Sequence, residues 1–318
     1  MFDKFKMLWC RFHLVAGEQG LVLPTLKSSL FFLDQFKGIL RQQVCKYTDK
    51  PCGECLLRGD CTYAYLYEEI TGASWSLRRF GPLPPPLVWQ PPLDKKTDYF
   101  PREKIVFNLV LCGRGLSFLK PLVDTVLQLS REGLSGKAGS FQVEQVFLEN
   151  PFSGEQLDLL EATEENAAHK KVVIQGREIV QWAEDHRELT RLSLRFLTPL
   201  LVKEDEAYLQ EPLFNVIMKV LFQRTQALYY FYHQQQEVDL DYNAFKEKSA
   251  RVQKVKDQTR FAPAGQTAKT AQQMPGILGE ALYTGDFQEL LPFLKLGEFI
   301  HLGEQAVYGL GRIQVKTG

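Results

Sequence analysis

The chain has 318 residues, and at roughly 100–200 residues per domain this length predicts about two domains. Hydrophobic residues make up 45% and charged residues 24%, which is ordinary globular usage and excludes a wholly disordered chain. Lysine plus arginine equals aspartate plus glutamate at 38 each, so the net charge is zero, which excludes a protein that coats nucleic acid through bulk charge.

We expect neither a signal peptide nor a membrane span. Asp3, Lys4 and Lys6 precede only a short apolar patch, Met7–Cys10, which is shorter than the apolar core of a signal peptide. No run of 18 or more uncharged apolar residues follows, so we expect no transmembrane helix and a cytoplasmic location.

A strand and a helix are predicted near the start of the chain. The even positions of Leu8–Leu14 are apolar or cysteine, while the odd positions include Arg11 and His13, as in a half-buried strand. An amphipathic helix follows from about Thr25 to Cys45, and a cysteine-rich insertion occupies residues 45–61.

Further strands and a helix complete the first half beyond a proline-rich passage at Pro82–Pro92. They are a strand at Ile105–Cys112, a helix at about Ser117–Arg131, a glycine-rich connector at Gly133–Gly139 and a strand at Phe141–Leu148. With one more strand expected before Ile105, the order is β-α-β-β-α-β, which is that of a ferredoxin-like domain.

The second half repeats this order after an acidic segment. Residues from about Glu155 to Glu188 are rich in acidic side chains and are expected to connect two domains, with a small hairpin around Lys171–Val180. The elements that follow are a strand around Leu192–Phe196, a helix from Leu209 to Leu228, a strand at Ile277–Phe287, a short helix near Glu289–Lys295 and a strand at Ile313–Val315.

We therefore predict an α+β fold made of tandem ferredoxin-like (RRM-like) domains with a cysteine-rich metal-binding insertion. The expected N-terminal domain covers residues 1–152, an acidic connection covers 153–188, and the C-terminal domain covers 189–318. This prediction rests on the repeated order of strands and helices alone, because the two halves show no repeat of the amino-acid sequence itself.

Four cysteines at C-x6-C-x2-C-x5-C spacing suggest a metal site. They are Cys45, Cys52, Cys55 and Cys61. A short loop can bring four sulfurs into a tetrahedron, and thiolates suit zinc or an iron–sulfur cluster, between which the sequence does not choose. We expect a structural metal, because no histidine or carboxylate marks an open catalytic position. The alternative is a set of reduced or disulfide-linked cysteines that pin the insertion.

A glycine-rich segment lies near the C-terminus, at residues 297–315. Gly303, Gly309 and Gly311 leave backbone amides open to close approach, which is how a chain can cradle phosphate without base specificity. The alternative is a tight turn between a helix and a strand that needs positive φ.

This segment resembles the C-terminal glycine-rich signature of the RAMP superfamily of CRISPR-associated proteins. More specifically, it is similar to the endoribonucleases that cut precursor CRISPR RNA within its repeats. Other motifs follow in the family's order, namely Leu23-Pro24, Cys61–Glu68, Phe107–Leu111, Gly133–Val143 and Arg195–Pro199. Two positions depart from the family pattern, since Glu304 stands where a positive charge is usual and Lys27-Ser-Ser replaces an arginine–glycine pair.

The resemblance implies repeat RNA bound across both domains and a cut that needs no metal. The 2′-hydroxyl upstream of the scissile phosphate attacks it and leaves a 2′,3′-cyclic phosphate, which requires a base, an acid and positive charge on the phosphate. Histidine suits the proton transfers. The catalytic candidates are His301, beside the glycine-rich loop, and His13 on the first strand. Either can instead be structural, with His301 packed under the loop and His13 against the neighbouring domain.

Basic side chains and the loop glycines are the candidates for RNA contact. They are Lys27, Arg41, Lys137, Arg195, Gly303, Gly309, Gly311 and Arg312. The basic stretch at residues 246–260 is a further electrostatic candidate. Each of these charges can also be merely solvated.

The sequence favours a repeat-cleaving endoribonuclease whose partner is CRISPR repeat RNA, with no membrane partner and no cofactor for catalysis. The alternative is a catalytically silent RAMP subunit that holds guide RNA among other CRISPR-associated effector subunits. A cysteine-metal DNA-binding protein is disfavoured, because no helix carries a dense basic recognition face.

Overall fold

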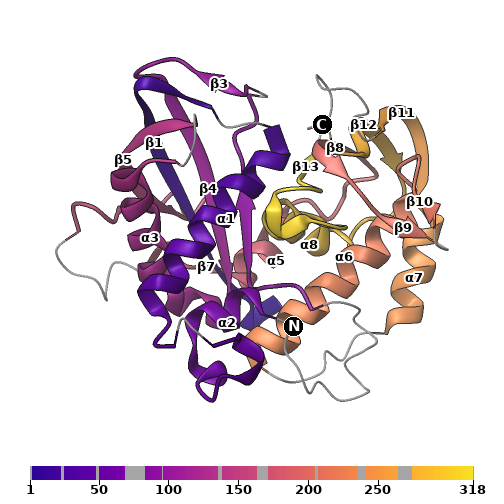
Figure 1. Cartoon of the computed structure of the whole chain (residues 1–318). Coiled ribbons are helices and arrows are strands. Elements are labelled where there is room, and N and C mark those ends of the chain that lie inside the picture. Colours follow the sequence, from indigo (N-terminus) through magenta and orange to yellow (C-terminus); the bar gives the residue numbers. More distant parts are fainter. Residues whose placement is uncertain are drawn as a thin grey trace.

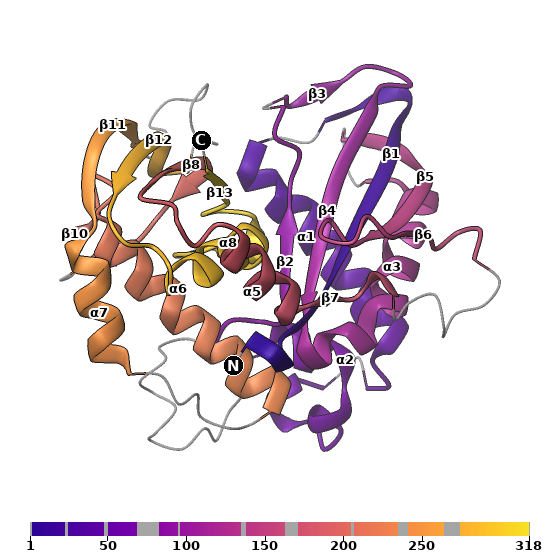
Figure 2. The same ribbon diagram turned by 180° about the vertical axis from the view of Figure 1, so that it is seen from behind.

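The computed structural model of the chain describes residues 2–22, 25–47, 50–68, 83–94, 96–134, 138–162, 171–204, 207–234, 241–263 and 274–317. These residues form two large antiparallel sheets that lie side by side, with helices packed between and around them (Figures 1 and 2). No helix within these ranges is both long and apolar enough to cross a membrane.

The first sheet is built around one long strand. β1 (Lys6–Val22) pairs antiparallel with β4 (Lys104–Cys112) on one side and with β5 (Gly139–Glu149) on the other. The other strands of this sheet are β2 (Leu87–Gln90), β3 (Asp98–Tyr99), β6 (Gln156–Asp158) and β7 (Ile174–Gln175). Helices α1 (Thr25–Val44) and α3 (Leu119–Glu132) cover one face, where Phe12 belongs to the same buried cluster as Phe36 and Leu122.

The second sheet has four strands and its own pair of helices. Across the sheet the strands are β11 (Gln253–Ala262), β12 (Gly276–Thr284), β8 (Arg191–Leu200) and β13 (Ile313–Lys316). The helices are α6 (Phe214–Tyr229) and α8 (Leu291–Ile300). Shorter elements are α2 (Thr62–Tyr67), α5 (Gly176–Asp185), α7 (Tyr242–Arg251), β9 (Lys203–Glu204) and β10 (Ala207–Tyr208).

Both sheets have the same strand order. The series β1-α1-β2-β4-α3-β5 and the series β8-α6-β11-β12-α8-β13 each follow the pattern β-α-β-β-α-β along the chain. Counted along each series, the second, third, first and fourth strands follow one another across the sheet. The prediction of an α+β fold is therefore confirmed, and both large sheets are antiparallel.

The two halves of the chain share one hydrophobic core. On the face of the first sheet that α1 and α3 leave uncovered, Met7, Val110 and Cys112 are fully buried, and they join a cluster that includes Leu194 and Ile217 of the second half. The second half therefore covers one end of this face. The other end stays open, as the 39% exposure of Val106 shows.

Polar and aromatic contacts fasten the beginning of β1 to the second half. The backbone N–H of Lys6 donates to Nε2 of His233 at 3.0 Å, and the His233 ring stacks on Phe5 with ring centroids 4.2 Å apart. Just before β1, the ring of Phe2 meets that of Phe293 on α8 edge to face, with ring centroids 5.1 Å apart. The separation between the two sheets is therefore set by directed bonds as well as by apolar packing.

The hairpin expected around Lys171–Val180 is wrong, and the edge strand β11 was not predicted. In place of the hairpin expected around Lys171–Val180, β7 pairs with β1 and then α5 begins with a capping box between Gln175 and Glu178. Helical spacing buries Ile179 and Ala183 of α5, and this outweighs the acidic composition of the segment. The basic stretch 246–260 contains the end of α7 and most of β11, whose side chains are largely exposed because it is an edge strand.

Candidate nucleic-acid interface

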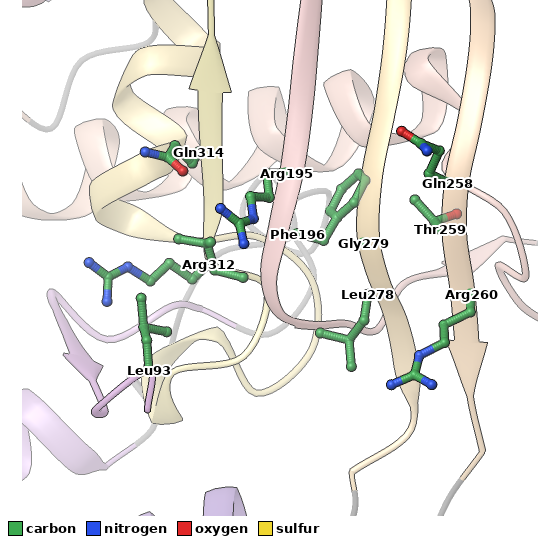
Figure 3. Close-up of a pocket in the computed structure, with 11 residues that line it drawn as sticks. Leu93, Arg195, Phe196, Gln258, Thr259, Arg260, Leu278, Gly279, Arg312 and Gln314 are labelled. Carbon is green, nitrogen blue, oxygen red and sulfur yellow. The ribbon is translucent and has the colours of Figure 1, made fainter. Parts of the chain in front are cut away.

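The second sheet carries a hollow of about 800 Å³ on the face turned away from its helices. All four strands contribute to it, and Leu93 of the first half lies at its edge (Figure 3). Among the described residues that line the hollow, three are arginines, namely Arg195, Arg260 and Arg312, and none is acidic. Arg195 and Arg260 are exposed to solvent. The hollow therefore presents positive charge to any anionic chain laid along the sheet.

Arg312 joins this hollow to the first sheet. Burial lowers the pKa of Arg312 to about 10, against the opposing effect of Glu298, so the side chain stays charged at neutral pH. Arg11 of β1 is near enough that its charge also lowers the pKa of Arg312. The guanidinium of Arg11 lies 4.7 Å from the ring centroid of Trp9 and pairs with Glu149 at 3.1 Å. Arg11 of the first sheet and Arg312, just before β13, are thus close enough for their like charges to disfavour each other, which an anion bound near both would relieve.

His13 lies two residues beyond Arg11 on the same face of β1. Its ring meets Phe147 edge to face with centroids 5.5 Å apart, and Val106 stands opposite it on β4. Burial, followed by the charge of Arg11, lowers the pKa of His13, so its imidazole is neutral at pH 7. His13 is thus half-buried on the open end of the first sheet.

His301, by contrast, is completely buried between the halves. Its Nδ1 lies 3.1 Å from the carbonyl oxygen of Leu310, to which it donates, and its Nε2 lies 3.1 Å from the side-chain amide nitrogen of Gln90, from which it accepts. Burial, with help from Arg312 and Arg224, holds the pKa of His301 well below its usual value. This corrects the expectation that His301 lies against RNA, because both ring nitrogens are bonded inside the protein.

Gln90 extends the buried bonds of His301 into the first sheet. Its side-chain oxygen accepts hydrogen bonds from Nε1 of Trp9 and Nδ2 of Asn108, each at 3.2 Å. The three residues lie on β1, β2 and β4, so one side chain ties three neighbouring strands to the C-terminal end of α8.

The glycine-rich loop folds back on the protein. Gly303, Gly309 and Gly311 all have positive φ. A Cβ atom at these positions would lie 2.4 Å from the Leu201 carbonyl oxygen, 2.3 Å from Cδ of Pro91 and 1.7 Å from the Leu302 carbonyl oxygen, respectively. The backbone N–H groups of Gly309 and Gly311 already donate to the carbonyls of Ala306 and Pro199. Turn geometry therefore explains these glycines, and the amides of Gly309 and Gly311 do not form an open phosphate cradle.

The same loop touches helix α1. Nζ of Lys37 donates to the hydroxyl of Tyr308 at 3.1 Å and lies 5.1 Å and 5.0 Å from the ring centroids of Tyr308 and Tyr67. One helical turn further on, Arg41 lies over Tyr63 at 5.8 Å. Sequence reasoning missed Lys37 and Tyr308. The one signal available was the matching four-residue spacing of two cations on α1 and two tyrosines on α2.

The remaining candidate RNA contacts lie apart from the hollow or outside the described residues. Nη2 of Arg41 donates to the carbonyl of Lys50 at 2.9 Å, which ties α1 to the cysteine-rich insertion. Glu304 pairs with Lys203 at 3.6 Å. The side chain of Lys27 on α1 and all of Lys137 lie outside the described part of the chain.

The four clustered cysteines are half-buried and free of disulfides. They are Cys45, Cys52, Cys55 and Cys61. Cys45 and Cys61 are close enough to Cys52 for their charges to affect it. In the described part of the chain, however, no three histidine, cysteine, aspartate or glutamate side chains are grouped so that they could hold a metal ion. The metal site stays a prediction.

Two family models match this chain. Residues 5–172, more than half of it, match the model AF_1859_N, described as an N-terminal domain, and residues 194–313 match CRISPR_Cas6, described as CRISPR-associated endoribonuclease Cas6. No curated protein matches the sequence.

Several solved structures are similar in fold. A product complex of Cas6 (TTHB231) from Thermus thermophilus is 17% identical, with a TM-score of 0.55 over 98% of this chain and 100% of that chain. A Cas6 (TTHA0078) substrate mimic complex is 15% identical, with a TM-score of 0.54 over 98% and 99%. A partial Cas6-RT-Cas1–Cas2 complex is 12% identical, with a TM-score of 0.58 over 99% of this chain and 47% of that chain. At these identities the likeness shows the fold alone.

The buried neutral state of His301 predicts acid sensitivity. Its folded pKa is lowered, so this group stabilises the fold fully above the unfolded value near 6.5 and loses that contribution as pH falls below it. One such proton lowers the free energy of unfolding by about 1.4 kcal/mol per pH unit. In urea titrations from pH 7.5 to 5, His301→Asn should reduce the change of the unfolding free energy with pH by about 1.4 kcal/mol per pH unit. The same slope in both proteins would contradict the assignment of this proton to His301.

The packing of Gly311 predicts a cost for adding a single methyl group. Because a Cβ atom would overlap the Leu302 carbonyl at positive φ, Gly311→Ala should lower the free energy of unfolding by about 1–3 kcal/mol. Gly38→Ala is the control, since nothing lies within 4 Å of its Cβ position inside α1, and it should stabilise by about 0.5–1 kcal/mol. Equal denaturation midpoints for the two variants would refute the account of the loop.

Proposed function

We propose that the chain, which belongs to the AF_1859_N family and matches the CRISPR-associated endoribonuclease Cas6 model over residues 194–313, cuts the repeat RNA of CRISPR precursor transcripts. The observation that carries this proposal is the arginine-lined hollow on the second sheet. Although the chain has no net charge, this hollow is lined by three arginines and by no acidic residue among those described, and such a local positive charge favours binding of a phosphate backbone.

The RNA backbone crosses from one open sheet face to the other in this proposal. Arg195 and Arg260 bind phosphates along the second sheet, and Arg312 with Arg11 holds a phosphate where the two faces meet. The repulsion between Arg11 and Arg312 supports this path, because an anion between them replaces an unfavourable contact with two favourable ones. Repeat RNA is thus the proposed partner, and the similar Cas6 folds include a product complex and a substrate mimic complex.

The proposed cut uses the RNA's own 2′-hydroxyl and no metal ion. The 2′-oxygen bonds to phosphorus as the bond to the 5′-oxygen breaks, the 2′-hydroxyl loses its proton, and the 5′-oxygen gains one. The products are a 2′,3′-cyclic phosphate and a 5′-hydroxyl. Positive charge stabilises the extra negative charge of the phosphorane. The described residues offer two places for proton transfer, His13 on the open end of the first sheet and the Lys37–Tyr308 contact.

We also propose that the chain is a duplication of one ferredoxin-like unit. The identical strand order of the two sheets supports this reading. The units would be residues 1–152 and 189–318, joined through 153–188. In this arrangement the binding surface is formed by the two sheet faces together, since Leu93 of the first unit borders the hollow of the second.

An RNA cleavage assay in the presence of a metal chelator tests the proposed function. RNA carrying the repeat of the source genome's CRISPR array, incubated with the protein in EDTA, should be cut once and leave a 2′,3′-cyclic phosphate, identified by mass spectrometry. Binding without a cut would instead identify a non-catalytic RNA-holding subunit. A cut that appears only with added Mg²⁺ would contradict the metal-free mechanism.

Salt dependence tests the proposed path of the RNA in the same assay. Removing two phosphate contacts with Arg195→Gln and Arg260→Gln should weaken binding and reduce the slope of log affinity against log salt by about 1.4, at roughly 0.7 per contact on a single strand. Arg131→Gln is the matched control, because this exposed arginine lies on α3, away from the hollow. The path is refuted if all three proteins share one slope.

We further propose that the four clustered cysteines bind a structural zinc ion or iron–sulfur cluster, which would require the insertion to bring its sulfurs together. Elemental analysis should then find about one zinc, or iron with sulfide, per chain. Cys52→Ser with Cys55→Ser should abolish the bound metal and lower the melting temperature. Cys112→Ala is the control outside the cluster and should retain the metal. Metal-free protein with an unchanged melting temperature would end this proposal.

A further inference from the structure

The contact between helix α1 and the glycine-rich loop differs from the other contacts that join the two halves. Most of the interface between the two halves consists of apolar side chains and buried hydrogen bonds between neutral groups. Here a lysine ammonium meets a phenol at 3.1 Å, between residues 271 positions apart in the sequence. Lys37 and Tyr308 are both half-buried, so the pair is partly open to solvent.

The surroundings of this pair carry further positive charge and further aromatic rings. Lys37 also lies 5.0 Å from the centroid of Tyr67, and Arg41 lies over Tyr63 one turn away. Cations interleaved with aromatic rings are the composition of surfaces that hold phosphates and stack bases. The pair therefore lies beside groups that can hold an RNA chain next to it.

We propose that Tyr308 is the catalytic acid of the cut and that Lys37 is its positioning residue. This inference rests on the proposed endoribonuclease function and names the atoms that would carry out one of its proton transfers. The hydroxyl of Tyr308 gives its proton to the leaving 5′-oxygen as the bond between that oxygen and phosphorus breaks. The 2′-hydroxyl proton passes to water, and the Tyr308 phenolate recovers a proton from water, so no proton is gained or lost overall.

The geometry of the contact suits this role. The ammonium of Lys37 donates to the Tyr308 oxygen, so it stabilises the negative charge that remains there once the phenol proton has left. The loop holds Tyr308 in place, because the next residue, Gly309, packs on Pro91 and leaves no room for a side chain. The acid is therefore presented on a rigid turn, as general-acid catalysis requires.

His13 is the rival site and is weaker for this step. Burial and the charge of Arg11 lower the pKa of His13, so at pH 7 its imidazole is mainly neutral and only a minor fraction carries the acidic imidazolium proton. His301 has both ring nitrogens bonded within the protein. Among the described residues, the Lys37–Tyr308 pair thus offers a proton donor with a cation bonded to its oxygen.

A substrate with a better leaving group tests the proposal directly. The single-turnover rate is measured on repeat RNA and on the same RNA with sulfur in place of the scissile 5′-oxygen, since a thiolate departs without a proton. Tyr308→Phe should slow the cut of ordinary RNA by about 10²–10⁴-fold. On the sulfur-linked RNA it should cut within a few fold of the unaltered protein.

Companion variants separate chemistry from folding. Lys37→Met should slow the cut of ordinary RNA, and Lys37→Arg should restore much of the rate, because a guanidinium also donates to the phenol oxygen. Tyr47→Phe is the matched control, as it removes a hydroxyl from the Lys50–Tyr47 cation–ring pair of the cysteine-rich insertion, which is not part of the proposed RNA path. Its rate and RNA affinity should be those of the unaltered protein.

The outcomes distinguish this proposal from the function it rests on. If the unaltered protein binds repeat RNA without cutting it, the endoribonuclease function fails and this inference fails with it. If the unaltered protein cuts, the inference is overturned when Tyr308→Phe cuts ordinary RNA at the parent rate. It is also overturned when that variant loses the same factor on both substrates, or when His13→Ala alone shows rescue by the sulfur-linked RNA.

Discussion

The buried bond between Gln90 and His301 is the constraint on which the arrangement of the two sheets depends. A histidine with 0% exposure must find a partner for each ring nitrogen, because an unpaired buried polar atom costs about 1–3 kcal/mol. Leu310 supplies one partner from the loop and Gln90 supplies the other from the first sheet. A shift of one half against the other would break these hydrogen bonds and disrupt the shared core at once. This interface therefore fixes the arginines of the two open sheet faces relative to each other.

The charges of the chain sum to zero, yet they are not mixed evenly over its surface. Many surface lysines are paired, as in Lys203 with Glu304 and Lys316 with Glu280. Arg195 and Arg260 form no salt bridge with any described residue, and both border the hollow. Surface ion pairs contribute little to stability, so their main effect here is electrostatic. In each of these pairs a carboxylate offsets the charge of the lysine, whereas no described carboxylate forms a salt bridge with Arg195 or Arg260.

The sequence predicted those parts of the fold that repeat a hydrophobic pattern, and it failed where the pattern was absent. The alternation in β1 and the amphipathic faces of α1 and α3 were visible because each element buries one face. β11 was missed because an edge strand exposes both faces, and polar side chains such as those of Gln258 and Arg260 give no alternation. For the candidate site, Arg195 and Arg312 were proposed from the sequence and both line the hollow, but the burial of His301 and the contact of Lys37 with Tyr308 depend on how two distant segments pack. No local pattern encodes that packing.

The shared core has a consequence for how the protein would discriminate among RNA molecules. Its two sheets are fixed relative to each other by side chains such as Met7 and Ile217, so the positions of Arg11 and Arg312 relative to each other are fixed as well. A rigid receptor of this kind offers little induced fit, and the entropy of ordering falls on the RNA. RNA strands whose unbound shape already fits this fixed arrangement of arginines would lose less entropy on binding, so selection by backbone shape would come before any reading of bases.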